Sequence, residues 1–487
     1  MTRTLAAVDL GAQSGRVASG RFDGHTLHVD EVHRFENTPV EEDGRLRWDL
    51  HRLRNEVATG LRKLSGDVAS VSVDSWAVDF GLLGAGGRLL HKPAHYRDAR
   101  RAGAFAGVLE RVPARELYGR TGVQLLPINT IFELAADADG DLGSARKLLM
   151  IPDLFHHWLC GSETTERTNA TSTQCLDVQT GDWARDLLER LEIPPAIFPD
   201  VVAPGTLLGP VTAGETGLGG VQVVAGATHD TAAAVAAVPL RGDRSAYLSV
   251  GTWSLVGVES DAPVVTDASY AANLTNEGGV DGTYRVLRNI TGLWLLHECR
   301  RAWADAGRHY EYAELIELAR SAEPLQAFID PNDARFSEPG NIPARIALYL
   351  AETGQRVPPD DAGIVRCVLE SLALKHAETV DALTNATGRQ IDELHVVGGG
   401  ANNDPLCGWT ASACARPVLA GPAEATLVGN LLMQARALGE ISSLAEGREV
   451  VRASFVPVLH EPDDAPVWGD ARERFAALAN AQVEVHA

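Results

Sequence analysis

An acidic residue closes the first apolar run of the chain, and small residues follow it at once. Residues 5–8 are typical of a short buried strand, Asp9 comes next, and residues 11–15 read Gly-Ala-Gln-Ser-Gly. Closely spaced backbone N–H groups in such a turn, with a hydroxyl nearby, can hold phosphate oxygens. A carboxylate beside them can hold Mg²⁺ through water. A tight hairpin with a surface aspartate fits the same residues, so this segment leaves both interpretations open.

A second carboxylate, Asp230, stands where a predicted strand gives way to a predicted helix. The strand covers residues 221–225, and an alanine-rich helix is expected to begin near Asp230. An aspartate at this position is most often a helix cap. It can also be a general base. The transition state of phosphoryl transfer is loose, so a carboxylate of ordinary pKa can accept the hydroxyl proton at a late stage of the reaction. His229 and Thr231 flank it as candidate hydrogen-bonding partners of a substrate.

Glycines end two other predicted strands. Residues 394–397 run into a triple glycine at residues 398–400, where the backbone can approach a flat or charged ligand. Gly251 and Thr252 follow the predicted strand 246–250 and offer a second set of donors to a phosphate. None of the four lysines stands in a glycine-rich loop, so a nucleotide would be bound without a P-loop.

The elements that must position these residues alternate between strand and helix patterns, which indicates an α/β architecture. Residues 5–20 predict two strands joined by a turn of small residues, and residues 246–258 repeat that form. The repeat suggests a duplicated domain with a cleft between the halves. A polar turn at residues 239–244 marks the boundary, so we predict domains over residues 1–240 and 241–487.

Two helices carry capping signals. Asp49 precedes apolar positions 50, 53, 57, 61 and 64, which have helical spacing. A longer helix is predicted between residues 358–361, which read Pro-Pro-Asp-Asp, and Gly388, because these residues favour the start and the end of a helix. Residues 68–76 alternate in polarity and predict a strand.

Charge and composition exclude two classes of partner. The chain has 487 residues, of which 45% are hydrophobic, and a formal net charge of −22. Such a surface repels the phosphates of nucleic acids and anionic lipids. No run approaches the roughly 20 apolar residues of a transmembrane helix, and the first residues do not read as a signal peptide. Six scattered cysteines predict reduced thiols. We expect a cytoplasmic protein, monomeric or a small homo-oligomer, without nucleic-acid or membrane partners.

Nearly the whole chain resembles the FGGY family of carbohydrate kinases. The resemblance lies in many motifs together rather than in any one of them. They read Val-Asp-Leu-Gly-Ala-Gln-Ser-Gly-Arg at 8–16, His-Arg-Phe at 33–35, Asp-Ser-Trp-Ala-Val-Asp-Phe at 74–80, Tyr-Arg-Asp at 96–98, Thr-Asn-Ala-Thr at 168–171, His-Asp-Thr at 229–231, Tyr-Leu-Ser-Val-Gly-Thr-Trp-Ser-Leu at 247–255, Asn-Leu-Thr-Asn-Glu-Gly-Gly at 273–279 and Val-Val-Gly-Gly-Gly at 396–400.

The resemblance implies two actin-like (ribonuclease H-like) domains around a catalytic cleft, with ATP and a ketose as small-molecule partners. It implies transfer of the γ-phosphate of ATP, with Mg²⁺, to the 1-hydroxyl of L-rhamnulose in the breakdown of L-rhamnose. Asp230 would be the proton acceptor, and the sugar contacts would be Ala77, His229, Asp230, Thr231 and Asn289. The nucleotide contacts would be Ala12, Gln13, Ser14, Gly15, Arg16, Thr252, His297 and Gly400, with Asp9 holding Mg²⁺ through water.

Three residues depart from the family's pattern. Ala77 stands where the family has a glycine at the sugar, His297 where it has a glutamine at the nucleotide, and Gln13 where it has a small hydroxyl residue. The methyl group of Ala77 keeps open a kinase of the same family for another ketose, such as L-fuculose, L-ribulose or D-xylulose. A third interpretation is a non-catalytic actin-like ATP switch or sugar sensor. Asp230 argues against that one, because a switch needs no base directed at a sugar.

Overall fold

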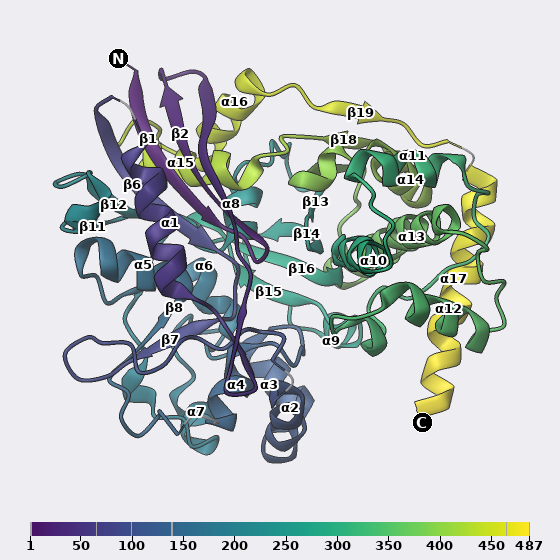
Figure 1. Cartoon of the computed structure of the whole chain (residues 1–487), viewed down its shortest axis with the longest axis horizontal. Helices are drawn as coiled ribbons and strands as arrows, with labels where there is room; N and C mark the ends of the chain where they lie inside the picture. Colours follow the sequence, from purple (N-terminus) through teal and green to yellow (C-terminus); the bar gives the residue numbers. More distant parts are fainter. Residues whose placement is uncertain (1, 65, 99, 138–139, 464, 487) are drawn as a thin grey trace. The chain divides into compact units, whose positions relative to one another are not determined.

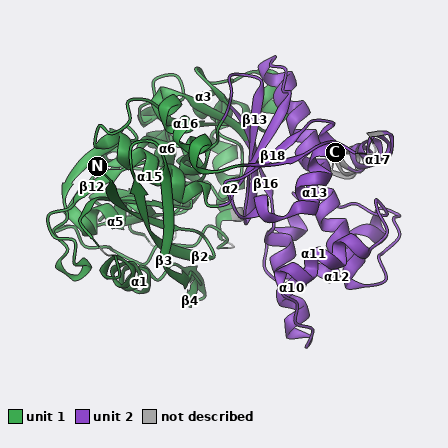
Figure 2. Ribbon diagram, turned by 90° about the horizontal axis from the view of Figure 1, so that it is seen from above, with its two compact units in different colours: residues 1–239, 259–287, 424–456 green, residues 240–258, 288–423, 457–487 purple. Residues whose placement is uncertain are grey.

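The computed structural model describes residues 2–64, 66–98, 100–137, 140–463 and 465–486. Within this part of the chain there are two compact units, each assembled from segments that are distant in sequence (Figure 2). Unit 1 comprises residues 1–239, 259–287 and 424–456, and unit 2 comprises residues 240–258, 288–423 and 457–487. The division into domains over residues 1–240 and 241–487 stays a prediction.

A sheet of six strands, counted over the described residues, forms the centre of unit 1 (Figure 1). Its order is β11-β12-β6-β1-β2-β3. β1 and β2 form the first predicted hairpin, with Leu5 opposite Gly20. β6 lies parallel to both β1 and β12, so the carboxyl ends of these three strands meet at one edge. The strands are β1 (Arg3–Leu10), β2 (Ser14–Phe22), β3 (Leu27–Glu36), β6 (Val68–Ser75), β11 (Thr206–Pro210) and β12 (Gln222–Ala225).

Helices pack on this sheet through their apolar faces. α1 (Leu50–Arg62) begins at its predicted cap, where the Asp49 carboxylate accepts a hydrogen bond from the Arg52 N–H at 3.0 Å. α15 (Ala425–Ala437) contacts β1 and β6, and it also packs against α8 (Asp230–Ala236). The Gln434 side chain of α15 donates to the Ala6 carbonyl at 2.9 Å and accepts from the Ser70 hydroxyl at 2.7 Å. α15 therefore connects the sheet to the helix that carries Asp230.

The rest of unit 1 is a second apolar core surrounded by short elements. Phe132, Leu148 and Leu188 are among its fully buried residues. β15 pairs antiparallel with β16 through residues 275–278 and 284–287. The remaining elements are β4 (Val40–Glu42), β5 (Arg45–Arg47), β7 (Phe80–Leu83), β8 (Lys147–Met150), β9 (Thr165–Glu166), β10 (Val201–Val202), β15 (Thr275–Gly278), α2 (Arg100–Arg111), α3 (Ala114–Thr121), α4 (Thr130–Ala136), α5 (Ile151–Cys160), α6 (Arg167–Ala170), α7 (Arg185–Arg190), α9 (Asp267–Ala271) and α16 (Leu444–Ser454). The strand β16 (Tyr284–Thr291) belongs to unit 1 up to residue 287 and to unit 2 from residue 288.

Unit 2 is built on strands in the order β14-β13-β17-β18-β19. β13 and β14 form the second predicted hairpin, with Val250 opposite Ser254, and β17 lies parallel to β13. The turn that follows β13 and the glycines that follow β17 therefore lie at the same end of neighbouring strands. The strands are β13 (Ser245–Val250), β14 (Trp253–Ser260), β17 (Glu393–Val397), β18 (Val418–Ala420) and β19 (Val458–His460).

The longest helix of unit 2 has the limits that its sequence predicts. α13 (Asp361–Thr387) is capped by Asp360, whose carboxylate accepts from the Gly363 N–H at 2.9 Å, and it ends at Gly388 with a left-handed φ of 68°. Only a residue without a Cβ adopts that conformation readily. The other helices are α10 (Trp294–Asp305), α11 (Tyr312–Ser321), α12 (Ile342–Glu352), α14 (Asp404–Cys414) and α17 (Ala465–His486).

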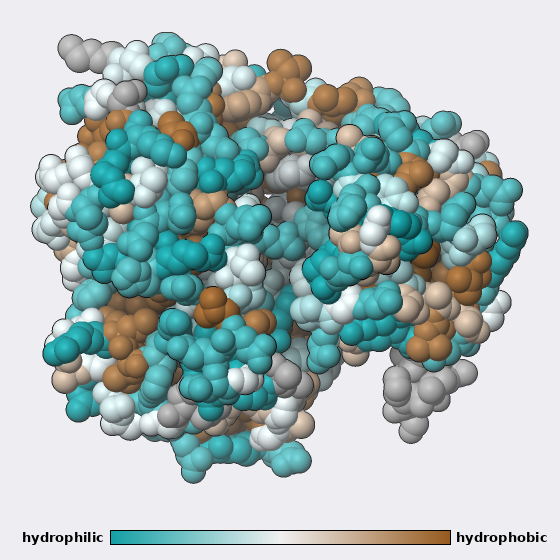
Figure 3. All heavy atoms as spheres, in the orientation of Figure 1, coloured by the Kyte–Doolittle hydropathy of each residue, from teal (hydrophilic) through white to brown (hydrophobic). Residues whose placement is uncertain are grey.

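Hydrophilic residues cover much of the face seen in Figure 3. Among the described residues, no helix combines the length and the apolar character that crossing a membrane requires. All six cysteines are free thiols, and five of them are buried. Burial raises the pKa of Cys367 to about 12, so this thiol stays protonated and is a poor nucleophile.

Candidate active site

The carboxyl ends of β1, β6 and β12 bring several candidate residues together in unit 1. Asp9 and Asp74 are partners in the parallel pair β1–β6. At the end of β6, Ser75 forms a bridge with His229, and the Ser75 N–H donates to the carbonyl of Thr228 at 2.9 Å. Ligands of open α/β sheets bind beyond the carboxyl ends of the strands. This edge is therefore the candidate site of unit 1.

The predicted phosphate segment, residues 12–16, comprises the end of the turn between β1 and β2 and the first residues of β2, and Asn37 holds it in place. The Asn37 side-chain amide donates to the Gly11 carbonyl at 2.8 Å, and its N–H donates to the Gln13 carbonyl at 2.9 Å. Both bonds use carbonyl groups, so they occupy none of the N–H groups of residues 12–16. Ala12 and Ser14 are half-buried and Gln13 is exposed.

Arg16, at the end of this segment, is a fixed cation next to the candidate magnesium ligand. It lies opposite Asp9 in the β1–β2 register and forms ion pairs with Asp9 and with Glu424. Burial works against the charge of Arg16, but the carboxylates of Asp9 and Glu424 raise its pKa above the usual range. A guanidinium held in this way presents donors to carboxylate or phosphate oxygens.

Asp74 is a buried carboxyl group whose surroundings favour the neutral acid. Burial, together with the charge of Asp9, raises its pKa well above the usual range. Its Oδ2 accepts a hydrogen bond from the Asn430 amide at 2.6 Å, while Oδ1 is buried without a hydrogen-bond partner among the described residues. The Gln434 amide donates to Asn430 Oδ1 at 2.8 Å, which fixes the direction of the Asn430 amide. Asp74 is thus a second carboxyl group beside Asp9 that sequence reasoning did not single out.

Asp230 is the first residue of α8 rather than its cap. The position before the helix belongs to His229, which makes no side-chain cap bond. The Oδ1 atom of Asp230 accepts from the N–H and, at 3.1 Å, from the hydroxyl of Thr231. Oδ2 has no hydrogen-bond partner in the described part of the chain. Burial, assisted by the charge of Asp9 and opposed by His229, raises the pKa of Asp230, which suits a group that must take up a proton.

A rare turn occupies the position of Ala77. The Asp79 N–H donates to the Ala77 carbonyl at 2.9 Å, and the intervening Val78 has a φ of 68°. This is the strained form of the γ-turn, and a branched Cβ makes it more costly. The Thr130 hydroxyl, which donates to the Val78 carbonyl at 2.6 Å, helps to hold the turn. Strained residues of this kind gather at functional sites.

The carboxylate of Asp79 anchors that turn from within the core. Its Oδ2 accepts from the indole N–H of Trp48 at 2.6 Å, from that of Trp76 at 2.9 Å and from the Tyr96 N–H at 3.2 Å. Its Oδ1 forms an ion pair with Arg101 at 2.7 Å. Burial nevertheless dominates over these partners and raises the pKa of Asp79 to about 6. We refer to Asp79 and its four donors as the Asp79 clamp.

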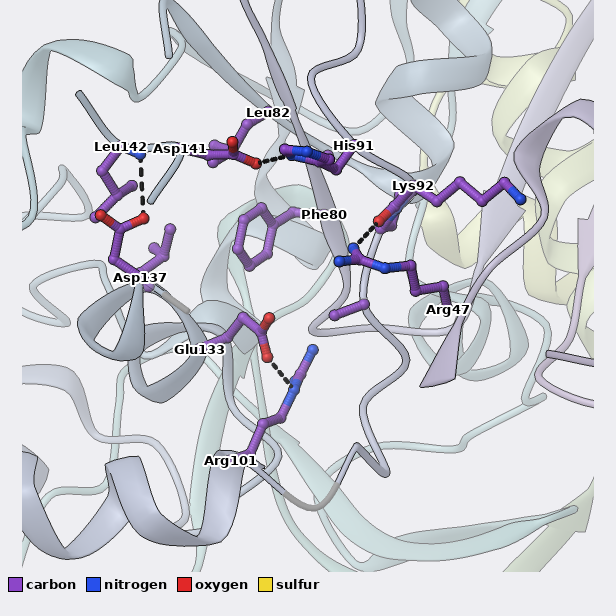
Figure 4. A pocket seen from close by; sticks show the side chains of 14 residues that line it. Arg47, Phe80, Leu82, His91, Lys92, Arg101, Glu133, Asp137, Asp141 and Leu142 are labelled. Atoms are coloured by element: carbon purple, nitrogen blue, oxygen red, sulfur yellow. Dashed lines mark hydrogen bonds and ion pairs between the residues drawn. The ribbon is translucent and has the colours of Figure 1, made fainter. Parts of the chain in front are cut away.

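The far side of Arg101 faces a small pocket (Figure 4). There the guanidinium Nε pairs with Glu133 at 2.7 Å, and across the pocket His91 pairs with Asp141 at 2.6 Å. The cavity is small, about 50 Å³, and has room for a few water molecules. Because Arg101 lines it, the pocket adjoins the Asp79 clamp.

In unit 2 the predicted turn at Gly251 and Thr252 is held by backbone contacts. The N–H groups of Gly292 and Trp294 donate to the Thr252 carbonyl at 3.1 and 3.2 Å. A Cβ on Gly292 would lie 2.5 Å from the Trp253 carbonyl carbon, so only glycine allows this approach. The motif at residues 288–292 thus positions the turn after β13.

The glycine run after β17 packs against the same turn. A Cβ on Gly400 would lie 2.2 Å from Val250 Cγ1, and one on Gly398 would lie 2.9 Å from the Val250 carbonyl oxygen. Gly398 also has a φ of 80°. Two of the three glycines are therefore required for packing, whereas a Cβ on Gly399 would meet no atom within 4 Å. Gly399 is the one whose backbone is open to a ligand.

His297 lies in α10 and is connected through Tyr312 to Asn403, which follows the glycine run. Its ring makes an edge contact with Tyr312 at 6.4 Å between centroids, and the Tyr312 hydroxyl accepts from the Asn403 amide at 3.1 Å. Burial, with help from Arg300, lowers the pKa of His297, so the ring is neutral and offers one donor and one acceptor. Asn289, the remaining predicted sugar contact, lies half-buried on β16.

Comparison with known families decides what kind of protein carries these groups. The description of the N-terminal domain of the FGGY family of carbohydrate kinases matches residues 4–237, and that of the C-terminal domain matches residues 246–438. The chain belongs to the FGGY family of carbohydrate kinases. It is accordingly an ATP-dependent sugar kinase.

Curated relatives within the FGGY family match over almost the full length. A rhamnulokinase of Bacteroides thetaiotaomicron is 41% identical over 484 residues, which cover 98% of this chain and 99% of that protein. A rhamnulokinase of Pectobacterium carotovorum is 42% identical over 98% of this chain and 97% of its own. A rhamnulokinase of Enterococcus faecalis is 38% identical, again over 98% of this chain and 97% of its own.

Solved structures of FGGY-type kinases have the same fold. A gluconate kinase from Lactobacillus acidophilus superposes with a TM-score of 0.79 at 17% identity, covering 99% of this chain and 98% of its own. A xylulose kinase from Rhodospirillum rubrum has a TM-score of 0.78 at 20% identity, with full coverage of both chains. The predicted fold class, α/β with two actin-like (ribonuclease H-like) domains, is confirmed.

Proposed function

We propose that this FGGY kinase transfers the γ-phosphoryl group of ATP to the 1-hydroxyl of L-rhamnulose, giving L-rhamnulose 1-phosphate and ADP. The observation that carries the proposal is the identity of 38–42% to rhamnulokinases over 98% of the chain. ATP and a free ketose are its small-molecule partners. We further propose that it works in the cytoplasm, where ATP is available, as a monomer or a small homo-oligomer.

The acceptor chemistry is assigned to unit 1. A bond forms between the sugar O1 and the γ-phosphorus, while the bond from that phosphorus to the bridging oxygen of ADP breaks. The proton of the 1-hydroxyl passes to Oδ2 of Asp230, the oxygen that the Thr231 contacts leave open. The raised pKa of Asp230 supports this role, because a base works best when its pKa is close to the operating pH.

The sugar contacts remain those inferred from the motifs. His229, Thr231 and Ala77 support the sugar from unit 1, and we assign Asn289 to the same substrate. The Thr231 hydroxyl already donates to Asp230, so it orients the base as well as offering an oxygen to the sugar. The Asp79 clamp lies next to Ala77 in the chain and keeps the methyl group of Ala77 in a fixed position relative to the turn.

The nucleotide contacts are assigned by unit. In unit 1 the N–H groups and side chains of residues 12–16 receive phosphate oxygens, with Arg16 as the cation. In unit 2 we assign Thr252, His297 and Gly400 to the nucleotide. The open backbone at Gly399 supports this assignment, because a flat or charged group can approach there without meeting a Cβ.

The carboxyl groups at the edge of β1 and β6 suit a magnesium ion. Mg²⁺ prefers oxygen ligands and is usually held by one or two carboxylates and by substrate phosphates, with water completing the shell. Asp9 offers such oxygens, and so does Asp74, whose buried Oδ1 lacks a described partner, once the charge of the ion has displaced its proton. Asp9 would hold the ion through water. The ion would neutralise charge on the transferring phosphate.

Release of ADP across a panel of sugars tests the proposal. The purified enzyme is given ATP, Mg²⁺ and, in turn, L-rhamnulose, L-fuculose, L-ribulose, D-xylulose or glycerol. We expect the highest kcat/KM with L-rhamnulose. Preference for another ketose would overturn the named substrate and keep the kinase, whereas ATP turnover unaffected by any of the sugars would overturn the assignment of a sugar acceptor.

A further inference from the structure

A buried arginine lies behind the histidine next to the proposed base. Arg285 of β16 has a side chain that is 0% exposed, and its Nε donates to the Gly278 carbonyl at 3.0 Å. Its Nη2 lies 3.0 Å from Glu277 Oε2 and 3.1 Å from Nδ1 of His229. All of these residues belong to unit 1.

The chemistry of these partners determines which ring nitrogen of His229 carries the proton. A guanidinium group has only donors and keeps its charge in proteins. The 3.1 Å contact with Arg285 therefore requires Nδ1 to accept, which leaves the proton of the neutral ring on Nε2.

Among the described residues, Glu277 is the acidic neighbour of Nδ1 that would favour the opposite tautomer. A carboxylate accepts, so it would draw a proton to Nδ1. Its Oε2 lies 3.4 Å from Nδ1, beyond the usual N–H···O range, and 3.0 Å from Arg285. Glu277 therefore orients Arg285, and Arg285 orients the ring.

We propose that Arg285, held by Glu277, is a positioning residue that fixes His229 as the tautomer protonated on Nε2. Nε2 lies 3.4 Å from Oδ1 of Asp230, which is also beyond the usual hydrogen-bond range, so its N–H acts on Asp230 as a nearby partial positive charge. Such a charge on that side stabilises negative charge on Oδ1 and leaves Oδ2 for the hydroxyl proton. The tautomer itself does not depend on the proposed function; its consequence for turnover rests on Asp230 being the base.

A gain in stability does not explain why the charged pair of Arg285 and Glu277 is buried. Removing two charges from water costs so much that buried ion pairs are often replaceable by apolar residues without loss of stability. Here a further donor, Nη1 of Arg285, is buried without a hydrogen-bond partner among the described residues, which adds to that cost. An apolar pair would fill the same space but could not direct the ring of His229.

The tautomer can be read directly from the full-length protein. Long-range ¹⁵N–¹H correlation on enzyme labelled with [¹⁵N]histidine distinguishes a protonated from an unprotonated ring nitrogen, and His229→Gln identifies the signals of residue 229. We expect an unprotonated Nδ1 and a protonated Nε2 in the wild type. In Arg285→Met we expect the proton to move to Nδ1, because Glu277 becomes the remaining partner.

Kinetics provide the second readout. Arg285→Met should lower kcat with the preferred ketose by about 100-fold, the size of effect that misplacement near the reacting atoms produces, with less than about a threefold change in the KM for ATP. Arg120→Met is the matched control, because it removes an arginine paired with Asp177 and Asp186 elsewhere in unit 1. It should leave tautomer and kcat unchanged.

Each outcome decides the matter. A wild-type ring protonated on Nδ1, or an Arg285→Met ring that keeps its proton on Nε2, overturns the proposal. If Arg285→Met does not fold, the wild-type spectrum still decides the tautomer, and Arg285→Lys, which keeps a donor, must preserve it. A wild type with the expected tautomer that prefers another ketose would overturn the substrate but not the role of Arg285.

Discussion

Gly429 of α15 lies against the carbonyl oxygen of Ala233 in α8, so closely that an added Cβ would be 1.7 Å from that oxygen. The contact fixes how far α8 lies from the sheet on which α15 packs. Asp230, the proposed base, is the first residue of α8. Backbone packing at Ala233, three residues after Asp230 in α8, therefore determines the position of the Asp230 carboxylate.

Replacing this glycine should affect stability and turnover together. Gly429→Ala forces the two helices apart, and overpacking of this kind costs about 1–3 kcal/mol or more in the free energy of unfolding. Urea unfolding and kcat are the measurements. Gly408→Ala is the control: it also lies in a helix, but its Cβ would meet only His460, at 3.9 Å. An unchanged unfolding midpoint for Gly429→Ala would contradict the contact.

Asp230→Asn should abolish most sugar phosphorylation while preserving the fold and ATP binding. The expected loss in kcat is about 10²–10⁴-fold, the usual contribution of a positioned base. Asp267→Asn is a matched control, because Asp267 is also the first residue of a helix, α9. If Asp230 only stabilised the start of α8, both variants would retain nearly wild-type turnover.

The Asp79 clamp should act on the sugar rather than on the nucleotide. Asp79→Asn leaves the guanidinium of Arg101 buried with less compensation, and breaking a buried pair costs about 3–5 kcal/mol. We expect the sugar KM to rise more than the KM for ATP. Trp48→Phe, which removes one donor and keeps the charge, should give the same pattern at smaller size. Equal changes in both KM values would indicate general loss of structure instead.

Glu166 should make stability depend on pH near neutrality. Its buried carboxyl accepts from Thr168 and Thr228, but burial outweighs these bonds and raises its pKa to about 7. Because the folded state holds this proton more tightly than the unfolded state, the contribution is complete below about pH 4.5 and declines as pH rises to about 7. The decline amounts to about 3 kcal/mol.

Glu166→Gln tests the sign of that effect. The variant cannot ionise, so its unfolding free energy should fall less steeply between pH 5 and pH 7 than that of the wild type. Chemical denaturation across this range measures the difference between the two proteins. Parallel curves would show that Glu166 has an ordinary pKa.

Ala77→Gly removes the methyl group by which the chain departs from its family. Crowding a packed contact costs about 1–3 kcal/mol, so its removal should widen the acceptance of bulkier ketoses. Activity on L-rhamnulose should persist and the KM for ATP should change little. An unchanged sugar ranking with an altered ATP dependence would remove residue 77 from the sugar contacts.

Local sequence patterns correctly predicted several secondary-structure elements of the protein. The hairpin at residues 5–20, its repeat at residues 246–258 and the limits of α13 depend on neighbours in the chain: strand alternation, a turn, a cap and a stop. The same patterns predicted that Asp230 begins a helix, although His229 holds the cap position. The predicted roles of the site residues remain proposals.

What local patterns could not reveal depends on contacts between distant segments. Burial beside Asp9 raises the pKa of Asp74, and its one hydrogen bond among the described residues comes from Asn430, 356 positions later. Tyr312 reaches the glycine run through Asn403, 91 positions away. Arg285 and Glu277 adjoin a motif, but their relation to His229 requires the β15–β16 hairpin to fold back onto residue 229. The periodicity of a single sequence reports local secondary structure and does not reveal contacts between distant residues.

The left-handed turn at Val78 has a consequence for directed evolution. Glycine adopts a φ of 68° without the penalty that a branched side chain incurs. A library screened only for survival of heating would therefore favour any residue that relaxes this φ and still fills the buried position of Val78. Screening the same library for discrimination between ketoses would retain valine, since a more flexible turn would no longer hold the Ala77 methyl group in one position. Selection for stability and selection for substrate discrimination would thus favour different residues at position 78, because stability and activity often conflict.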